Sequence, residues 1–239
     1  MEQTEIPSSP EAFAQALERL EPAASAQLIE NVEPSLSAAA LRLMGPKSAS
    51  EIMSLLSEAA RNAVNALLPS EVSAQWRLNL TFPKGSVGRL MDPAWAVFSP
   101  ETEVRSAVES LRGIVKREFI TYAWVAGADK KLAGVVVMRD LLFADPSRPL
   151  SEIMLKDPFS LKAGEPLMEA MRMVLNRHFP VYPVTSGSGE LIGAVRGGRL
   201  FEAQAIEISA QAGSMVGVEK EEKLSTRWTR SFKYRHPWL

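Results

Sequence analysis

The side chains of this 239-residue chain that could do chemistry are mainly carboxylates, because cysteine is absent and histidine occurs only twice. His178 and His236 are too far apart in the sequence to indicate a metal site or a catalytic pair. Without cysteine there can be no disulfide, thiolate zinc site or cysteine nucleophile. The sequence also lacks a Gly-x-Ser-x-Gly element, a P-loop and a zinc-binding helix motif. We therefore expect no catalytic residues and no enzyme activity.

Opposite charges nearly cancel over the chain, with 28 acidic and 27 basic residues and a formal net charge of −1. A protein that holds nucleic acid by neutralising phosphates would be basic, so we expect no nucleic-acid partner. The distribution is uneven, because residues 1–86 carry ten acids and six bases whereas residues 224–239 carry four bases and no acid. The acidic N-terminal third could attract cations in a diffuse way.

The last sixteen residues alternate basic and aromatic side chains. Cations meet anionic headgroups at a membrane surface and aromatic rings lie at its boundary, so this segment suits a position beside a membrane. A solvated basic tail is the alternative. We find no run of residues that could span a bilayer as a helix, and no secretory signal. The basic residues are Arg227, Arg230, Lys233 and Arg235, and the aromatic ones are Trp228, Phe232, Tyr234 and Trp238.

The first third of the chain repeats with a period of twelve residues. Proline recurs as Pro22, Pro34 and Pro46, and its fixed φ suits the first turn of a helix. Helices of about two turns are too short to be stable alone, so we predict a stacked array that buries a shared apolar stripe. A plain bundle with proline-bounded loops is the alternative. Apolar residues recur in two phases, Leu20, Val32, Met44, Leu56 and Leu68 in one and Leu28, Ala40, Ile52 and Val64 in the other.

Residues 87–145 and 150–205 repeat a longer pattern. In the first part of the two copies Leu90-Met91 matches Ile153-Met154, and after a short deletion in the second copy Gly134 matches Gly193. Each copy predicts a β-α-β-β-α unit: a short strand, a helix with apolar spacing, an apolar strand, a turn, and a last strand entered through glycine. The expected strands are 97–98, 120–125 and 132–138 in the first copy and 159–161, 181–184 and 191–195 in the second, with helices around 104–111 and 167–174.

This duplicated plan with its methionine lead-in resembles the pair of cystathionine-β-synthase (CBS) domains, over about residues 87–209. Three further segments resemble MgtE-type magnesium transporters. Residues 82–93 are similar to that family's element tyrosine-proline-x-acid-(Ser/Thr)-Ala-Gly-x-(Leu/Ile)-Met-Thr-Pro. Residues 132–146 are similar to Leu-x-Gly-Val-x-Ser-Leu-Arg-Asp-Leu-Leu followed by Asp-Pro. The closing Arg235-His236-Pro237-Trp238-Leu239 is similar to the family's Arg-Leu-Pro-Trp-Leu.

The resemblance implies an α+β protein, with an all-α helical-repeat N domain, a tandem CBS module of β-α-β-β-α repeats and a C-terminal basic helix. It also implies a homodimer formed through the CBS domains, at the cytoplasmic face of the cell membrane, with the protein's own membrane domain following Leu239. These residues themselves are expected to be soluble. The expected boundaries are 1–80 for the N domain, 81–86 for a linker, 87–149 and 150–209 for the CBS domains, and 210–239 for the connecting helix.

Members of the family bind Mg²⁺ between facing carboxylates, and the ion compacts this region and closes the pore. Mg²⁺ prefers oxygen ligands and can bridge carboxylates that otherwise repel. Here Lys84-Gly85 stands where the family has an acid, and Gly198-Arg199 stands where it has paired aspartates, so we expect fewer or weaker magnesium sites. For each remaining acid the alternative is an ordinary solvated carboxylate. The acids at or near matching positions are Asp92, Asp145, Glu152, Asp157, Glu165, Glu190, Glu202 and Glu207.

CBS domains also bind adenine nucleotides through Gly-h-h-(Thr/Ser)-x-x-Asp, in which h is apolar, the hydroxyl contacts phosphate and the aspartate holds the ribose. The first copy keeps Gly134 and Asp140 but has Val137 in place of the hydroxyl. The second copy, at residues 193–199, loses both the hydroxyl and the aspartate. At most one degraded nucleotide site is therefore expected, at Gly134, Val137 and Asp140. The alternative for Asp140 is an N-cap of a helix that begins at Leu141.

The resemblance thus implies the cytosolic magnesium-sensing and gating region of an MgtE-like transporter or channel for magnesium or another divalent cation. Two alternatives stay open: a soluble CBS-pair regulator that binds an adenine nucleotide, and a scaffold whose ligand sites are degenerate. A membrane domain encoded directly after Leu239 would distinguish the transporter from the soluble regulator.

Overall fold

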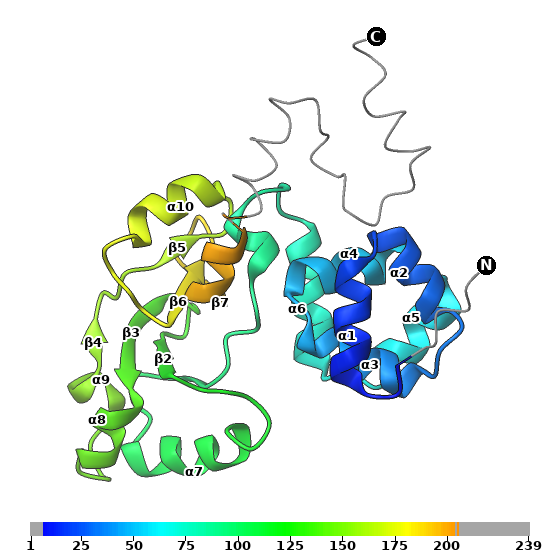
Figure 1. Cartoon of the computed structure of the whole chain (residues 1–239). Coiled ribbons are helices and arrows are strands. Elements are labelled where there is room, and N and C mark those ends of the chain that lie inside the picture. The colour runs from blue at the N-terminus through cyan, green and yellow to red at the C-terminus, as the bar shows by residue number, and fades with distance from the viewer. Residues whose placement is uncertain (1–6, 204, 206–239) are drawn as a thin grey trace. The chain divides into compact units, whose positions relative to one another are not determined.

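The computed structural model describes residues 7–203 and 205. Most of the described residues fall into two compact units, one formed by residues 7–80 and the other by residues 81–200 (Figure 1). We refer to the described residues 7–80 as the helical unit and to residues 81–200 as the sheet unit. The connecting helix expected at 210–239 lies outside the described residues.

The helical unit, as described, consists of six short helices, each of which begins twelve residues after the previous one. Proline stands at the start of the first four helices. The fifth follows Ser57, whose hydroxyl accepts a hydrogen bond from the Ala60 N–H. The period predicted from the sequence is therefore the spacing of the helix starts. The helices are α1 (Pro10–Arg19), α2 (Pro22–Ile29), α3 (Pro34–Leu43), α4 (Pro46–Leu55), α5 (Glu58–Asn65) and α6 (Ser70–Leu80).

Each of these helices packs against the next but one: α1 against α3, α2 against α4, α3 against α5, and α4 against α6. Residues of both predicted apolar phases lie on the sides of the helices that pack together. Short helices stacked in this way share one core, so the structure is the predicted array. The fully buried members are Met44, Leu56 and Leu68 in the first phase and Ala40, Ile52 and Val64 in the second, while Leu20, Val32 and Leu28 are half-buried.

Two charged side chains of the helical unit satisfy backbone groups at helix ends. The Glu30 carboxylate accepts hydrogen bonds from the Ser57 N–H at 2.7 Å and from the Ser57 hydroxyl at 2.9 Å, at the start of α5. The Arg61 guanidinium donates to the carbonyls of Met53 at 3.0 Å and Leu56 at 2.6 Å, at the end of α4. Because helix ends leave backbone groups without intrahelical partners, these two charges stabilise the array.

The sheet unit contains the two β-α-β-β-α repeats. In the first, β1 (Val97–Phe98) is parallel to β2 (Tyr122–Ala126), and β2 pairs antiparallel with β3 (Leu132–Val137). Helix α7 (Val104–Ile114) connects β1 to β2, and helix α8 (Met138–Phe143) follows β3. In the second, β5 (Leu161–Lys162), α10 (Leu167–Val174), β6 (Val181–Thr185) and β7 (Leu191–Arg196) follow the same plan. The strand predicted at 159–161 is found at 161–162, and the α+β class is confirmed.

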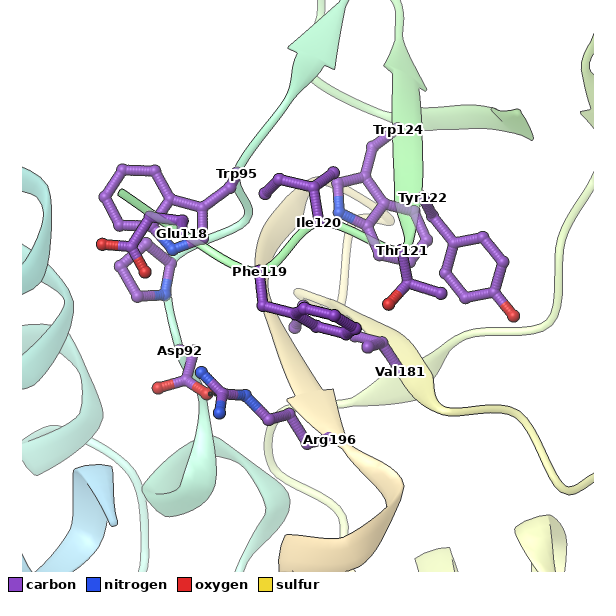
Figure 2. Close-up of a pocket in the computed structure, with 12 residues that line it drawn as sticks. Asp92, Trp95, Glu118, Phe119, Ile120, Thr121, Tyr122, Trp124, Val181 and Arg196 are labelled. Atoms are coloured by element: carbon purple, nitrogen blue, oxygen red, sulfur yellow. Dashed lines mark ion pairs between the residues drawn. The ribbon is translucent and has the colours of Figure 1, made fainter. Parts of the chain in front are cut away.

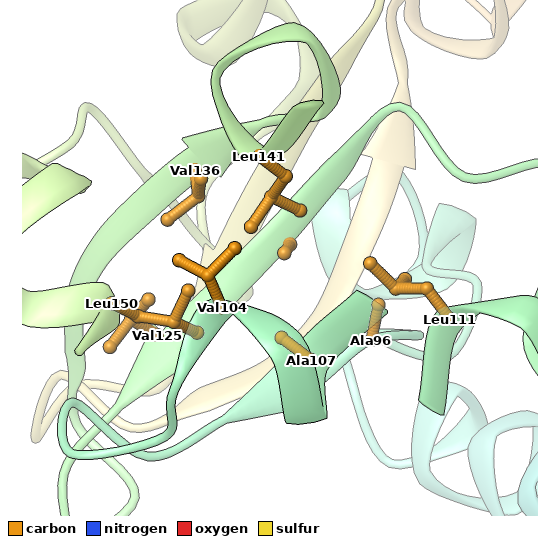
Figure 3. Close-up of a cluster of buried hydrophobic side chains, with 9 residues drawn as sticks. Ala96, Val104, Ala107, Leu111, Val125, Val136, Leu141 and Leu150 are labelled. Carbon is orange, nitrogen blue, oxygen red and sulfur yellow. The ribbon is translucent and has the colours of Figure 1, made fainter. Parts of the chain in front are cut away.

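The core of the first repeat lies between α7 and α8 and one face of its sheet (Figure 3). Val104, Ala107 and Leu111 are buried on α7 and pack with Val125 from β2 and Val136 from β3. The apolar spacing therefore identified the buried face of this helix. In the second repeat the predicted positions are buried as well, at Leu167, Ala170, Met171 and Val174.

The lead-in of each repeat joins the sheet of the other repeat. β4 (Leu155–Lys156), which follows α9 (Leu150–Ile153), pairs with β3, and Asp92, which follows η1 (Val87–Leu90), pairs with Ala194 in β7. Glycine in each last strand makes room for this exchange. A Cβ at Gly134 would clash with the side chain of Met154, and a Cβ at Gly193 would lie 3.0 Å from Met91 Sδ. The repeated methionines and glycines thus lock the two repeats together.

The turns of the two repeats also meet. Lys131 and Glu190 form an isolated bridge, and they occupy equivalent positions when Gly134 is aligned with Gly193. Beside this bridge the Leu132 N–H donates to the Gly189 carbonyl at 3.2 Å, and the Leu191 N–H donates to the Lys130 carbonyl at 2.9 Å. A position that pairs with its own counterpart indicates an approximate two-fold relation between the repeats.

Candidate functional site

A shallow hollow opens on the surface of the sheet unit (Figure 2). Its wall comes from the lead-in before β1, from the segment before β2, and from β2, β6 and β7, so it lies where the two repeats meet. Small ligands bind preferentially in concave sites that combine apolar or aromatic walls with a few polar groups. This hollow is therefore the candidate ligand site of the sheet unit.

Asp92 is held at the edge of the hollow by backbone pairing with β7. Its N–H donates to the Ala194 carbonyl at 2.9 Å, and its carbonyl accepts from the Ala194 N–H at 3.0 Å. The side chain is 26% exposed, and one carboxylate oxygen lies 3.4 Å from Nε of Arg196. Burial raises the pKa of Asp92 because it disfavours the charged form; Arg196 and Arg199 oppose this rise, and Glu118 adds to it.

Aromatic rings form much of the remaining wall. Tyr122 and Trp124 are two residues apart on β2, so both project from the same face, and their ring centroids are 5.5 Å apart. Trp95 lies at the other end of the hollow and Phe119 lies between them (Figure 2). Thr121 Oγ1 is enclosed and has no hydrogen-bond partner among the described residues. The accessible rings of such a wall can stack against a planar ring.

The residues expected to bind a nucleotide lie elsewhere in the first repeat. Gly134 is buried in β3, Val137 ends β3, and Asp140 lies in the first turn of α8. The Asp140 carboxylate accepts hydrogen bonds from Nε of Arg139 at 3.1 Å and from Nη2 at 3.0 Å. Asp140 is not an N-cap, so that alternative was wrong. The helix begins as soon as β3 ends, and Val137 occupies the cap position.

Two of the acids expected to bind magnesium are engaged by neighbours in the sequence. Asp145 accepts hydrogen bonds from the Ser147 hydroxyl at 2.7 Å and from the Ser147 N–H at 2.9 Å, and these bonds lower the pKa of Asp145. Glu152 pairs with Arg148 at 2.8 Å. Both carboxylates therefore already have partners that a metal ion would have to replace.

The other expected magnesium ligands are spread over the sheet unit and beyond it. Glu165 accepts a hydrogen bond from the Lys162 N–H at 3.4 Å, and Glu190 accepts one from the Ser188 hydroxyl at 3.1 Å. In the described part of the chain, no three acidic or histidine side chains come close enough to hold a metal ion. Asp157 is exposed with a φ of +49°, Glu202 is among the described residues, and Glu207 lies outside them.

Sequence reasoning missed Arg196, although its position carries a signal. It stands where the nucleotide signature of the second repeat should have a hydroxyl, and its counterpart in the first repeat is Val137. An arginine in place of a hydroxyl introduces a positive charge, and its Nε lies 3.4 Å from the Asp92 carboxylate. The basic residues Arg227, Arg230, Lys233 and Arg235 lie outside the described residues, so their role beside a membrane stays a prediction.

The fold and the exchanged repeats are those of a protein with CBS domains, and residues 150–205 match the family model of the CBS domain. In sequence the chain is homologous to the magnesium transporters MgtE. The MgtE of Bacillus subtilis (strain 168) is 24% identical over 164 residues, which are 68% of this chain and 36% of the relative. The MgtE of Thermus thermophilus is 28% identical over 130 residues, 54% of this chain and 29% of the relative.

Solved structures show the same fold over most of the chain. The soluble part of a magnesium transporter has a TM-score of 0.66 and 22% identity, with coverage of 83% of this chain and 79% of that chain. The cytosolic domain of the Mg²⁺ channel MgtE in complex with ATP has a TM-score of 0.66 and 23% identity, with coverage of 80% and 78%. The chain spans just over a third of the length of the first curated relatives, 36% and 38%. Among the described helices, none has the length and apolar character needed to cross a membrane.

Proposed function

We propose that this chain is the cytosolic magnesium-sensing and gating region of an MgtE-like transporter or channel for magnesium or another divalent cation. The observation that carries the proposal is the architecture: a helical-repeat unit followed by two exchanged CBS-type repeats, as in the soluble part of a magnesium transporter. Sequence similarity to MgtE transporters supports the same conclusion. The region acts as a gate and carries out no catalysis.

In this proposal the region forms a homodimer through its CBS domains at the cytoplasmic face of the cell membrane. Its connecting helix leads to the membrane domain, and the basic aromatic segment lies beside the headgroups, where its cations are attracted to anionic lipids. The domains are 1–80 for the N domain, 81–86 for the linker, 87–149 and 150–209 for the CBS domains, and 210–239 for the helix.

Mg²⁺ held between facing carboxylates would supply the gating signal. The ion prefers oxygen ligands, keeps part of its water and bridges acids that otherwise repel. Asp145 and Glu152 fit this role poorly because they already accept hydrogen bonds from protein groups. Exposed carboxylates such as Glu11, Glu18 and Glu33 remain on the helical unit. Neutralising such acids compacts the region, and loss of the ion loosens it.

Limited proteolysis of the linker tests this proposal. We expect millimolar MgCl₂ to slow tryptic cleavage after Lys84 several-fold, because bridged carboxylates restrict the motion of the chain on either side. NaCl of equal ionic strength controls for screening, and ATP at the same concentration controls for nucleotide binding. Equal cleavage with and without Mg²⁺ would refute ion gating, and stronger protection by ATP would favour a nucleotide sensor.

The hollow favours a second candidate function, the binding of an adenine nucleotide by the CBS pair. Tyr122, a half-buried residue of the wall, offers a ring against which a purine can stack. Arg196 at the edge of the hollow could receive a phosphate. A related MgtE cytosolic domain was solved in complex with ATP, which supports this alternative.

Tryptophan fluorescence tests the second candidate, because Trp95 and Trp124 line the hollow. We expect ATP to change the emission saturably in the wild type, and Trp95→Ala to weaken the apparent affinity by about tenfold, the effect of losing one ring stacked on a base. Asp140→Asn, outside the hollow, is the matched control and should bind like the wild type. Loss of binding in Asp140→Asn alone would place the nucleotide at the signature of the first repeat, which contains Asp140. A wild type whose tryptophan emission shows no saturable change with ATP would reject the second candidate function.

A further inference from the structure

Asp92 differs in its surroundings from the other expected magnesium ligands. Its side chain is 26% exposed, and the charged groups that act on it are Arg196, Arg199 and Glu118. A carboxylate with so little water around it needs a counter-charge, because removing it from water costs more than neutral hydrogen bonds return. A divalent cation could supply that charge, yet the guanidinium of Arg196 already stands 3.4 Å from Oδ2. The site therefore does not fit a magnesium ion.

We propose that Arg196 is a built-in counter-ion that fastens the lead-in of the first repeat to β7, so that this junction does not require Mg²⁺. The ion pair adjoins the backbone bridge between Asp92 and Ala194, with its two hydrogen bonds of 2.9 and 3.0 Å. On the same stretch Met91 packs against Gly193. Side-chain charge, backbone bridge and methionine packing thus hold one short junction together.

The second junction shows that the ion pair is an addition to the fold. There β4 pairs with β3, and the positions that match Asp92 and Arg196 are Leu155 and Val137. Leu155 is 59% exposed. This junction forms without a buried charge and needs no counter-ion. The ion pair at the first junction is therefore not required to form the sheet. It acts on the segment through which the chain enters the two CBS-type repeats.

The inference deepens the proposed function and rests on it only where it concerns magnesium. A guanidinium tethered to β7 stays in place at every Mg²⁺ concentration, whereas a bound ion leaves when its concentration falls. The first junction is therefore always fastened, and Asp92 does not belong to the sensing ligands. The magnesium response must come from acids elsewhere in the chain.

Hydrogen exchange at the amides of Asp92 and Ala194 measures the opening of this junction. In the wild type we expect equal protection with and without millimolar Mg²⁺. Arg196→Gln removes the closer counter-charge of the half-buried carboxylate, so both amides should exchange several-fold faster. The double variant Asp92→Asn with Arg196→Gln removes the whole pair and should return exchange to within about twofold of the wild type.

Arg172→Gln is the matched control, because Arg172 pairs with Glu169 on the exposed surface of α10, and the junction should be unchanged in it. Wild-type protection that rises with Mg²⁺ would overturn the proposal. So would wild-type exchange in Arg196→Gln, or a double variant that exchanges as fast as Arg196→Gln. If no other segment responds to Mg²⁺, the proposed sensing function fails, while the comparison of variants still decides the role of Arg196.

Discussion

At the scale of single residues, burial and charge act on Asp92 in opposite directions. Burial raises its pKa, and Arg196 and Arg199 limit the rise. Asp145 behaves in the reverse way, because hydrogen bonds from Ser147 lower its pKa. The partner of Asp145 is two residues away and could be anticipated from a turn-forming Asp-Pro-Ser segment, whereas the partner of Asp92 comes from the other repeat. The pKa of an aspartate is thus raised at Asp92 and lowered at Asp145.

The raised pKa of Asp92 makes part of the stability depend on pH. The folded chain keeps the Asp92 proton to a higher pH than the unfolded chain, whose value is 3.8, so between the two pKa values the folded chain binds more protons. The free energy of unfolding therefore falls as pH rises through this window. Asp92→Asn lacks this contribution.

We expect the Tm of Asp92→Asn, relative to that of the wild type, to rise as the pH increases from below 3.8 to neutrality. Thermal unfolding followed by circular dichroism measures this difference. A Tm difference that stays constant over that range would mean that Asp92 titrates alike in the folded and unfolded chains.

At the scale of elements, the exchange of lead-ins depends on the glycines of the last strands. We expect Gly134→Ala to lower the free energy of unfolding by about 1 to 3 kcal/mol, because its Cβ would clash with Met154 and the side chain would have to shift. Gly113→Ala in α7 is the matched control. Its Cβ would meet nothing within 4 Å, and alanine should be neutral or stabilise by up to about 1 kcal/mol.

Urea unfolding of the two glycine variants measures both effects. Equal stabilities for Gly134→Ala and Gly113→Ala would show that the lead-in of the second repeat does not pack on β3.

The elements that could be predicted from the sequence are those with a local signal. Proline at the twelve-residue period marked helix starts, and apolar spacing marked the buried faces of α7 and α10. β4 was not predicted, because a two-residue strand has no period and its partner strand belongs to the other repeat. The hollow was missed for the same reason: its wall forms only when the first lead-in meets β7 and the segment before β2.

At the scale of the whole molecule, each unit has its own source of stability. The helical unit is held by stacking of next-but-one helices, and the sheet unit by exchanged lead-ins and paired turns. A magnesium sensor built from such units can respond by changing how they are arranged, without unfolding either. The excess of acids in residues 1–86 gives a cation a target in this rearrangement.

Small-angle X-ray scattering tests most directly the central claim that this chain is a magnesium-responsive gating region. We predict that millimolar MgCl₂ lowers the radius of gyration, whereas NaCl of equal ionic strength leaves it unchanged, because a bridging ion and not general screening draws the carboxylates together. The same radius of gyration in both salts would contradict the claim.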